Sequence, residues 1–442
     1  MWSILKHPVF ARLFAAQVVA LLGTGLLTVA LGLLAYDLAG GRAGVVLGLA
    51  LTIKMVAYVG LSPVMQAAVE VLPRRAVLVG ADMVRAGIAL CLPFVSEVWQ
   101  IYVLIFALQA ASATFTPAFQ ATLPDVLPDE GNYTRALSLS RLAYDIENLA
   151  SPALAGLLLT VMSYNWLFLG TVAGFCASAL LILGAAVPPV GAGVGQRPFR
   201  ERVTRGIRIY LATPRLRGLL ALNFLAAASG AFVLVNTVVL VRGSYGGSET
   251  DLAVAMGCFG AGSMATALAL PRLLDRVEDR PVMMAAALAL VALSLVLAAG
   301  LTLGMGWGAM LAGWAGIGAL WAAILTPSGR LLRRSAHAGD RPAIFAAQFA
   351  LSHACWLVTY PLAGWAGVTI GLGPTLGLLT LLGLGAVAVA WRVWPRDAEG
   401  VITHRHPDLP PDHPHLEAHG QGARHAHEVI IDDTHHRWPT HG

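Results

Sequence analysis

Most of the residues that could bind a metal ion are gathered at the C-terminal end of the chain. Ten of the 13 histidines fall within residues 404–442, and these are His404, His406, His413, His415, His419, His425, His427, His435, His436 and His441. Imidazole suits Ni²⁺, Cu²⁺, Zn²⁺ and Co²⁺, and the carboxylates among these histidines could complete the coordination. Because prolines and charges are frequent here, we expect a disordered metal-binding tail over residues 396–442. An affinity tag and a solvated tail without purpose are the alternatives.

A second group of chemically active residues lies inside long apolar runs, namely Lys54, Asp145, Glu147, Asn148, His353 and Cys355. A charge at the centre of a bilayer costs about 3 kcal/mol on insertion scales, so these residues are candidates for a substrate or proton pathway. In a helix, Arg141, Asp145 and Asn148 share one face. Glu147 is turned about 200° from Asp145 and therefore faces elsewhere.

Each of these residues also has a purely structural interpretation. Asp145 and Asn148 could hydrogen-bond to a neighbouring helix, and Glu147 could pair with Lys54 so that each neutralises the other. His353 could be a hydrogen-bonded core residue, and Cys355 could serve only for packing. The residues alone leave both interpretations open.

The amino-acid composition predicts the helices that position these residues. Apolar residues make up 57% of the 442 residues and charged residues 12%, about half the charged share of a soluble domain. About 20 apolar residues cross a bilayer as a helix. We therefore predict an all-α integral membrane protein with twelve spans, at residues 12–36, 43–68, 76–96, 99–121, 135–161, 165–187, 216–241, 251–270, 282–303, 306–328, 341–370 and 374–394.

The longest break between spans divides the chain into two groups of six. We expect an N-terminal half at residues 1–187, a cytoplasmic central loop at 188–215 and a C-terminal half at 216–395. The sequence "SPALAG" (151–156) recurs as "YPLAG" (360–364), and "TP" recurs at a similar offset. Two pseudo-symmetric halves with a site between them are the layout of a transporter.

Arginine predicts the orientation. If the N-terminus lies inside, nearly all loop arginines fall on the cytoplasmic side, and only Arg42 and Arg242 fall outside. Positive charge favours the cytoplasmic face, so both termini and the tail should be cytoplasmic.

The loop "QAAVEVLPRR" (66–75) resembles the loop after the second span of the major facilitator superfamily, with Glu70, Arg74 and Arg75 at matching positions. It departs from the family pattern at Gln66, Val71 and Pro73. "GADMVRAG" (80–87) is also similar to the family pattern. The resemblance implies gating or structural ion pairs formed by Glu70, Arg74, Arg75, Asp82, Arg85 and Arg141.

Three stretches look like bacterial exporters related to siderophore efflux proteins: "TPAFQATLPDVLP" (116–128), "ALSLSRLAYDIENLASPALAG" (136–156) and "FAAQFALSHACWLVTYPLAGW" (345–365). The histidine-rich tail is similar to that of nickel-resistance exporters of the NreB type. The resemblance implies a monomer in the bacterial inner membrane that exports a divalent metal in exchange for protons. Nickel is the first choice and cobalt the second, and zinc is a further ion for the tail. The expected partners are lipid, metal and protons, without nucleic acid or a resident cofactor.

Two other functions stay open. One is proton-coupled efflux of drugs or siderophores with a regulatory tail, which a cavity lined by Trp314, Trp321 and Trp356 would favour. The other is a membrane metal sensor. The sequence contains no Walker loop, nucleophile elbow or HExxH motif, so we predict neither an enzyme nor an ATP-driven pump.

Overall fold

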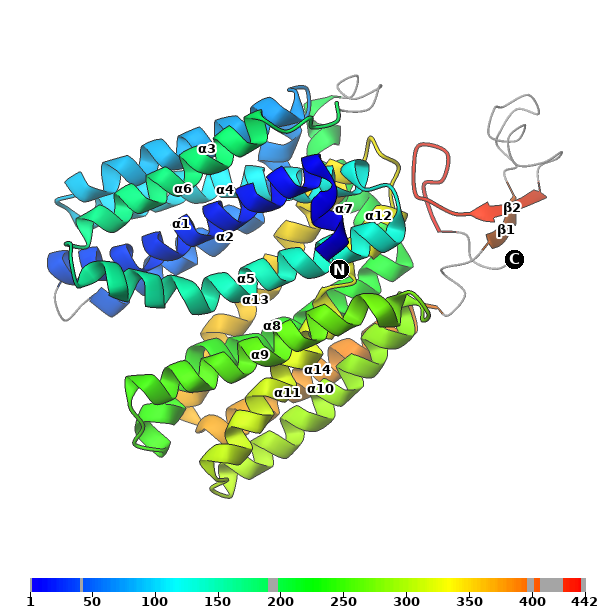
Figure 1. The fold of residues 1–442 in the computed structure, drawn as a ribbon. Helices are drawn as coiled ribbons and strands as arrows, with labels where there is room; N and C mark the ends of the chain where they lie inside the picture. Colours follow the sequence, from blue (N-terminus) through cyan, green and yellow to red (C-terminus); the bar gives the residue numbers. More distant parts are fainter. Residues whose placement is uncertain (1, 40–42, 190–197, 396–400, 406–423, 439–442) are drawn as a thin grey trace.

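The computed structural model describes residues 2–39, 43–189, 198–395, 401–405 and 424–438, which are almost wholly helical (Figure 1). In chain order the elements are η1 (Trp2–Lys6), α1 (Pro8–Ala39), α2 (Ala43–Val69), α3 (Arg74–Cys91), η3 (Leu92–Phe94), α4 (Val98–Val126), α5 (Glu130–Leu159), α6 (Asn165–Leu183), α7 (Phe199–Ala212), α8 (Pro214–Val239), η4 (Leu240–Ser244), α9 (Glu249–Leu274), α10 (Asp279–Thr302), α11 (Trp307–Leu325), α12 (Ser328–Arg334), α13 (Arg341–Thr369), α14 (Leu372–Val393), β1 (Val401–Arg405) and β2 (Arg424–Glu428).

Eleven helices in the described part of the chain are long and apolar enough to cross a membrane. The helix α5 is not among them, and it carries the charged residues Glu130, Arg135, Arg141, Asp145 and Glu147. It nevertheless packs between α1 and α9, as a membrane span would. The prediction of an all-α membrane protein is therefore confirmed, and the number of spans is close to the predicted twelve.

The helices form two halves that repeat one packing pattern. In the first half (α1–α6), α1 contacts α5 and α6, α3 contacts α4 and α6, and α2 contacts α4. In the second half (α8–α14), α8 contacts α13 and α14, α10 contacts α11 and α14, and α9 contacts α11. Equivalent helices make equivalent contacts, as the internal sequence repeat predicts. The main contacts between the halves join α2 to α13 and α5 to α9.

Two glycines bring α9 unusually close to α11. A Cβ atom on Gly262 would overlap the backbone of Ala315, and one on Gly318 would overlap the backbone of Phe259. Small residues at such crossings let membrane helices approach until their backbones touch. This packing fixes the position of α9, which faces the first half.

The two halves form a V in Figure 1. They separate at one end, and they meet at the other end, where η1, α7 and α12 lie. Polar contacts between the halves are found at this second end, for example from Tyr133 in α5 to Gly329 in α12 at 3.2 Å. We call it the closed end.

The expected central loop at 188–215 contains a helix, α7. Arg205, Gly206, Ile209 and Tyr210 are its buried residues, and their spacing places them on one helix face. The face packs against α13 and α2. The connection between the halves thus includes a helix that the sequence analysis did not predict, because an amphipathic segment between two bundles can bury its apolar side against them.

The tail also differs from the predicted disorder. Strands β1 and β2 pair in an antiparallel register that places His404 opposite His425 and Ile402 opposite His427. Backbone hydrogen bonds between extended segments can form whatever the side chains are, so a polar composition does not prevent pairing. The tail residues His406, His413, His415, His419 and His441 lie outside the described residues.

Candidate functional site

A buried polar cluster joins the two halves between α5 and α9. Asp145 is 3% exposed. One of its carboxylate oxygens accepts a hydrogen bond from Arg141 at 2.7 Å, and the other accepts one from Ser263 at 2.7 Å. The Arg141 guanidinium also lies 4.0 Å from the ring centroid of Trp321. Asp145 is thus held by hydrogen bonds, one of which crosses between the halves.

A second cluster lies midway along α2, α5 and α13. The Tyr58 ring packs edge-on against His353, with 4.8 Å between the ring centroids, and Lys54 Nζ lies 5.6 Å from the Tyr58 centroid. Lys54 is also within electrostatic range of both Glu147 and His353. The structure therefore brings Lys54, Glu147 and His353 together, with the first two from one half and His353 from the other.

The tautomer of His353 can be assigned from its hydrogen bond. The Nδ1 atom lies 2.7 Å from the backbone carbonyl oxygen of Phe349. A carbonyl only accepts, so Nδ1 carries the proton and donates it. In the neutral ring the Nε2 atom then keeps its lone pair, as it must to accept a proton or bind a metal.

Of the other predicted pathway residues, Cys355 does not contact this cluster in the described structure. Cys355 is buried, and its thiol donates to the Leu351 carbonyl oxygen of its own helix at 3.4 Å. It follows His353 by two residues, so it points to another side of α13. Asn148 lies in α5, and its side chain is outside the described part of the structure.

The three tryptophans proposed for an aromatic cavity divide into two kinds. Trp314 is fully buried and donates to Thr237 at 2.9 Å, so it belongs to the core of the second half. Trp321 and Trp356 pack edge-on, with 6.5 Å between their ring centroids, and Trp356 also packs against the ring of Tyr360. Since Trp321 also contacts Arg141 of the first half, these aromatic residues border the contact between the halves.

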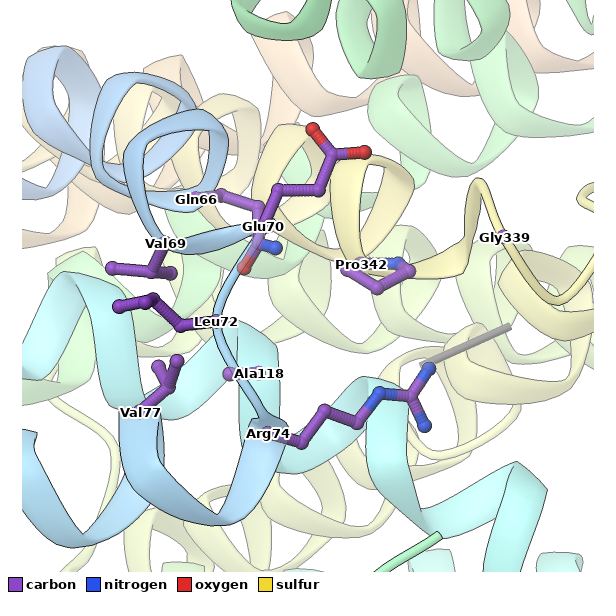
Figure 2. A pocket seen from close by; sticks show the side chains of 9 residues that line it. All are labelled: Gln66, Val69, Glu70, Leu72, Arg74, Val77, Ala118, Gly339 and Pro342. Atoms are coloured by element: carbon purple, nitrogen blue, oxygen red, sulfur yellow. The ribbon is translucent and has the colours of Figure 1, made fainter. Parts of the chain in front are cut away.

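At the closed end, Asp125 forms an ion pair with one arginine from each half. It contacts Arg74 of α3 and Arg341 of α13. Glu70 lies near Arg202 of α7, with 4.0 Å between the charged atoms. Figure 2 shows Glu70 and Arg74 pointing apart at the rim of a small cavity. The family-like loop thus contributes to two separate contacts.

A second group of ion pairs lies beside α12. Glu130 of α5 contacts Arg330 at 2.8 Å and Arg334 at 2.5 Å. Both arginines also contact the buried Asp279 of α10, at 3.0 and 3.2 Å. Charge alternates along this group, so each arginine lies between an acid of the first half and an acid of the second.

The predicted gating residues Asp82, Arg85 and Arg75 do not take part in the ion pairs between the halves in the described part of the chain. Asp82 and Arg85 form an ion pair within α3, and Arg85 stacks on Phe115 and Phe175 of the same half. These contacts stabilise the first half without reaching the second. Arg75 is exposed.

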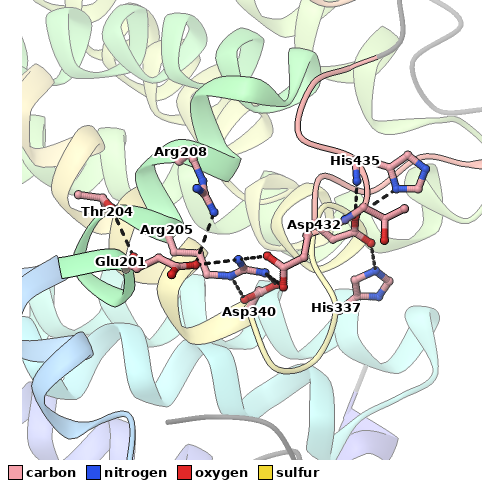
Figure 3. A network of polar contacts seen from close by, with 10 residues as sticks. Glu201, Thr204, Arg205, Arg208, His337, Asp340, Asp432 and His435 are labelled. Atoms are coloured by element: carbon pink, nitrogen blue, oxygen red, sulfur yellow. Dashed lines mark hydrogen bonds and ion pairs between the residues drawn. The ribbon is translucent and has the colours of Figure 1, made fainter. Parts of the chain in front are cut away.

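Part of the histidine-rich tail contacts the closed end (Figure 3). His337, in the loop before α13, lies 3.3 Å from a carboxylate oxygen of Asp432, and His435 lies 3.1 Å from the other. The hydrogen bond to Asp432 raises the pKa of His337, although burial opposes the shift. Among the described residues, no group of three histidine, cysteine or acidic side chains is arranged to hold a metal ion.

Sequence reasoning missed Tyr58, Ser263 and most of the closed end. In the sequence alone, the arginines of "RLLRRSAHAGDR" (330–341) indicate only the orientation of the chain. Their partners could have been sought among the acids of "LPDVLPDEGN" (123–132), since buried arginines need a counter-ion. No pattern in either segment, however, says which acid meets which arginine.

Comparison with known proteins places the chain in a family. The family model for the Major Facilitator Superfamily matches residues 13–242, just over half of the chain. Macrolide efflux protein A of Streptococcus pyogenes is 25% identical over 187 residues, which is 41% of this chain and 45% of that protein. The uncharacterised MFS-type transporter YfiS of Bacillus subtilis (strain 168) is 26% identical over 216 residues, which is 47% of this chain and 50% of that protein. The chain thus aligns with about half the length of these relatives.

Solved structures share the fold at low sequence identity. The human organic anion transporter MFSD10 and an outward-facing bacterial homologue of the iron transporter ferroportin both have a TM-score of 0.67 at 14% identity. Each comparison covers 87% of this chain and nearly all of the other protein. The transporter FucP in its outward conformation has a TM-score of 0.66 at 15% identity, over 87% of this chain and 98% of that one. The solved structures share the fold, and the family match establishes that the chain belongs to the major facilitator superfamily, whose members are membrane transporters and not enzymes.

Proposed function

We propose that this transporter is a secondary active exporter that exchanges an intracellular substrate for protons. The observation that carries the proposal is the cluster where the two halves meet, in which Tyr58 packs against both Lys54 and His353 and Lys54 interacts electrostatically with Glu147. Titratable groups inside a membrane protein mark substrate and proton pathways, and rocking of two halves changes their exposure. A group that is protonated from one side can then release its proton to the other.

We further propose that the protein lies in the bacterial inner membrane with both termini cytoplasmic. The arginine distribution supports this orientation. The closed end would then face the cytoplasm, and the open end of the V in Figure 1 would face outward. The described arrangement would be the one that releases substrate and receives protons from outside.

The substrate that we propose is a divalent transition metal, with nickel first and cobalt second. The ten histidines of the tail are suitable ligands, and His353 keeps Nε2 available at the centre. Metal ligands must be deprotonated, so metal and protons compete for the same groups. This competition is the basis of exchange.

An organic toxicant is a second candidate substrate. Tyr58, Phe349, Trp321 and Trp356 supply aromatic surface near the contact between the halves. Lys54 places a positive charge close to Glu147 and His353, which opposes a bound metal ion. Relatives named macrolide efflux protein A also favour this alternative.

A tolerance experiment separates the two candidates. The full chain is expressed in a sensitive bacterium, and growth is measured against nickel, cobalt, zinc and a macrolide separately. We expect increased tolerance to nickel or cobalt, and none in cells with equal amounts of the Glu147→Gln variant. Tolerance to the macrolide alone would rule out the metal and support the organic substrate.

Removing residues 404–442 should leave transport intact at high metal and reduce it at low metal. The tail is outside the membrane helices, so its loss removes a metal reservoir and the contacts of residues 428–438 with the closed end, but not the pathway. The measurement is metal uptake into inverted vesicles over a range of concentrations, with the amount of protein checked. Complete loss of uptake at every concentration would contradict this division of roles.

A further inference from the structure

Residues 428–438 pack tightly against the closed end of the transporter. We call this segment the strap. Val429 is 0% exposed, Ile431 3% and His435 6%. Ile431 belongs to the apolar core of the second half, and Trp438 packs against the same core. The strap is therefore fixed by apolar burial as well as by charge.

An arginine clamp holds the strap to α7. Arg205 is 3% exposed, and it donates to Asp433 of the strap at 2.7 Å and to Asp340 before α13 at 2.8 Å. One guanidinium therefore joins the strap, α7 and the start of α13. A buried arginine with two carboxylates is a strong, directional contact.

A second arginine anchors the two ends of the strap. Arg215 of α8 is 1% exposed and donates to Ser335 at 2.8 Å. It lies 3.7 Å from Glu428, and its guanidinium is 5.8 Å from the ring of Trp438.

The helix that the strap holds also contacts the first half. Arg202 of α7 lies near Glu70, and α7 packs against both α2 and α13. A Cβ on Gly206 would overlap the backbone of Ala343, so α7 and α13 are in direct backbone contact. Fixing α7 therefore helps to keep the closed end together.

Several histidines lie at or near the turn around Asp432, which shapes the strap. The Asp432 carboxylate accepts from the backbone N–H of Thr434 at 2.8 Å and of His435 at 2.6 Å. The same carboxylate contacts the His435 ring. The His427 ring lies 5.2 Å from that of His435, and His436 beside it is exposed. A metal ion bound by all three of these imidazoles must reorient them, because no group of three ligands is preformed in the described residues.

We propose that the strap is a metal-released lock on the closed end. Without metal, it holds α7 and keeps the two halves together at that end. A divalent transition metal bound by His427, His435 and His436 draws His435 away from Asp432, the turn opens and the strap leaves. The metal step rests on the proposed metal binding by the tail, whereas the docking rests on the contacts alone.

The test measures the strap directly in the full-length protein. The four native cysteines are replaced by alanine, and spin labels are placed at the exposed positions Arg437 of the strap and Arg217 of α8. We expect one short distance without metal and a longer, broader one after addition of Ni²⁺. Mg²⁺ should change nothing, since it does not favour imidazole. A broad, long distance in the metal-free protein overturns the docking, and a short distance that Ni²⁺ leaves unchanged overturns the release.

A substitution tests the clamp without metal. Asp433→Asn should lengthen the distance in the absence of Ni²⁺, while Glu278→Gln, an exposed acid at the same end, should not. If the strap stays docked in Asp433→Asn, the Arg205 clamp does not hold it.

A second pair of labels tests the role of the strap as a lock. Labels at the exposed Arg75 and Arg276, one in each half, should move apart when Ni²⁺ releases the strap, and an unchanged distance overturns this role. Release of the strap in a chain that gives no nickel tolerance supports the lock and removes nickel as substrate.

Discussion

Replacing His353 by Gln should reduce proton-driven transport by about 5- to 150-fold, with the protein still folded in the membrane. Glutamine cannot take up a proton or supply an imidazole lone pair, and losing such a partner in a buried site costs about 1–3 kcal/mol. The measurement is substrate uptake into inverted vesicles under an imposed pH gradient. Uptake should also lose its dependence on pH, which a defect in packing alone would not cause.

Cys355→Ala is the matched control for this prediction. Cys355 lies on the same helix two residues away, and its thiol bonds only to the backbone of that helix in the described structure. Uptake by this variant should therefore stay near that of the unmodified protein.

Two further substitutions extend the prediction. Glu147→Gln should behave like His353→Gln. Asp145→Asn should also block transport, because it leaves the Arg141 charge uncompensated between the halves. Near-normal uptake by all three variants would leave these residues as packing residues.

Neutralising Asp125 should shift the protein strongly towards an arrangement in which the closed end is open. Asp125 is paired with Arg74 of one half and Arg341 of the other, and all three side chains are less than 20% exposed. Asp125→Asn leaves two arginines facing each other. Loss of a buried pair costs about 3–5 kcal/mol, and partial exposure reduces this to about 2–3 kcal/mol. The ratio of closed to open protein should then fall by about 30- to 150-fold.

The distance between spin labels at Arg75 and Arg276 measures this shift, because the two positions are exposed in different halves. Asp129→Asn is the control. Asp129 lies four residues from Asp125, but its carboxylate caps α5 by accepting from the backbone of Asn132 at 2.8 Å. It should not change the distance between the halves. A distance in Asp125→Asn equal to that of the control would show that the pair does not hold the end closed.

The sequence by itself determined the membrane helices and their repeat. A helix satisfies its backbone hydrogen bonds within itself, so a long apolar run forms a span whatever its neighbours are. For the same reason Lys54, Glu147 and His353 could be placed midway along their helices by counting residues. Helical geometry also separated Asp145 from Glu147, and the structure places Asp145 beside Ser263 while Glu147 interacts with Lys54.

Only the tertiary structure decided which charges pair. Asp125 and Arg341 are 216 residues apart, and Arg205 and Asp433 are 228 apart. Such pairs depend on which helix ends the packing brings together, and a charge in the sequence carries no record of its partner. The arginines therefore predicted an orientation without revealing the ion pairs that they form.

The same reason explains the largest departures from the sequence-based expectations. In the sequence, the segment that forms α7 looks like a connection between the halves, and the strap looks like part of the tail. Each of these two segments has too few apolar residues to fold alone. The helix α7 buries its apolar face against α2 of one half and α13 of the other, and Ile431 of the strap is buried in the core of the second half. Burial of this kind is a property of the assembled fold, so it becomes visible only once the helices have been placed.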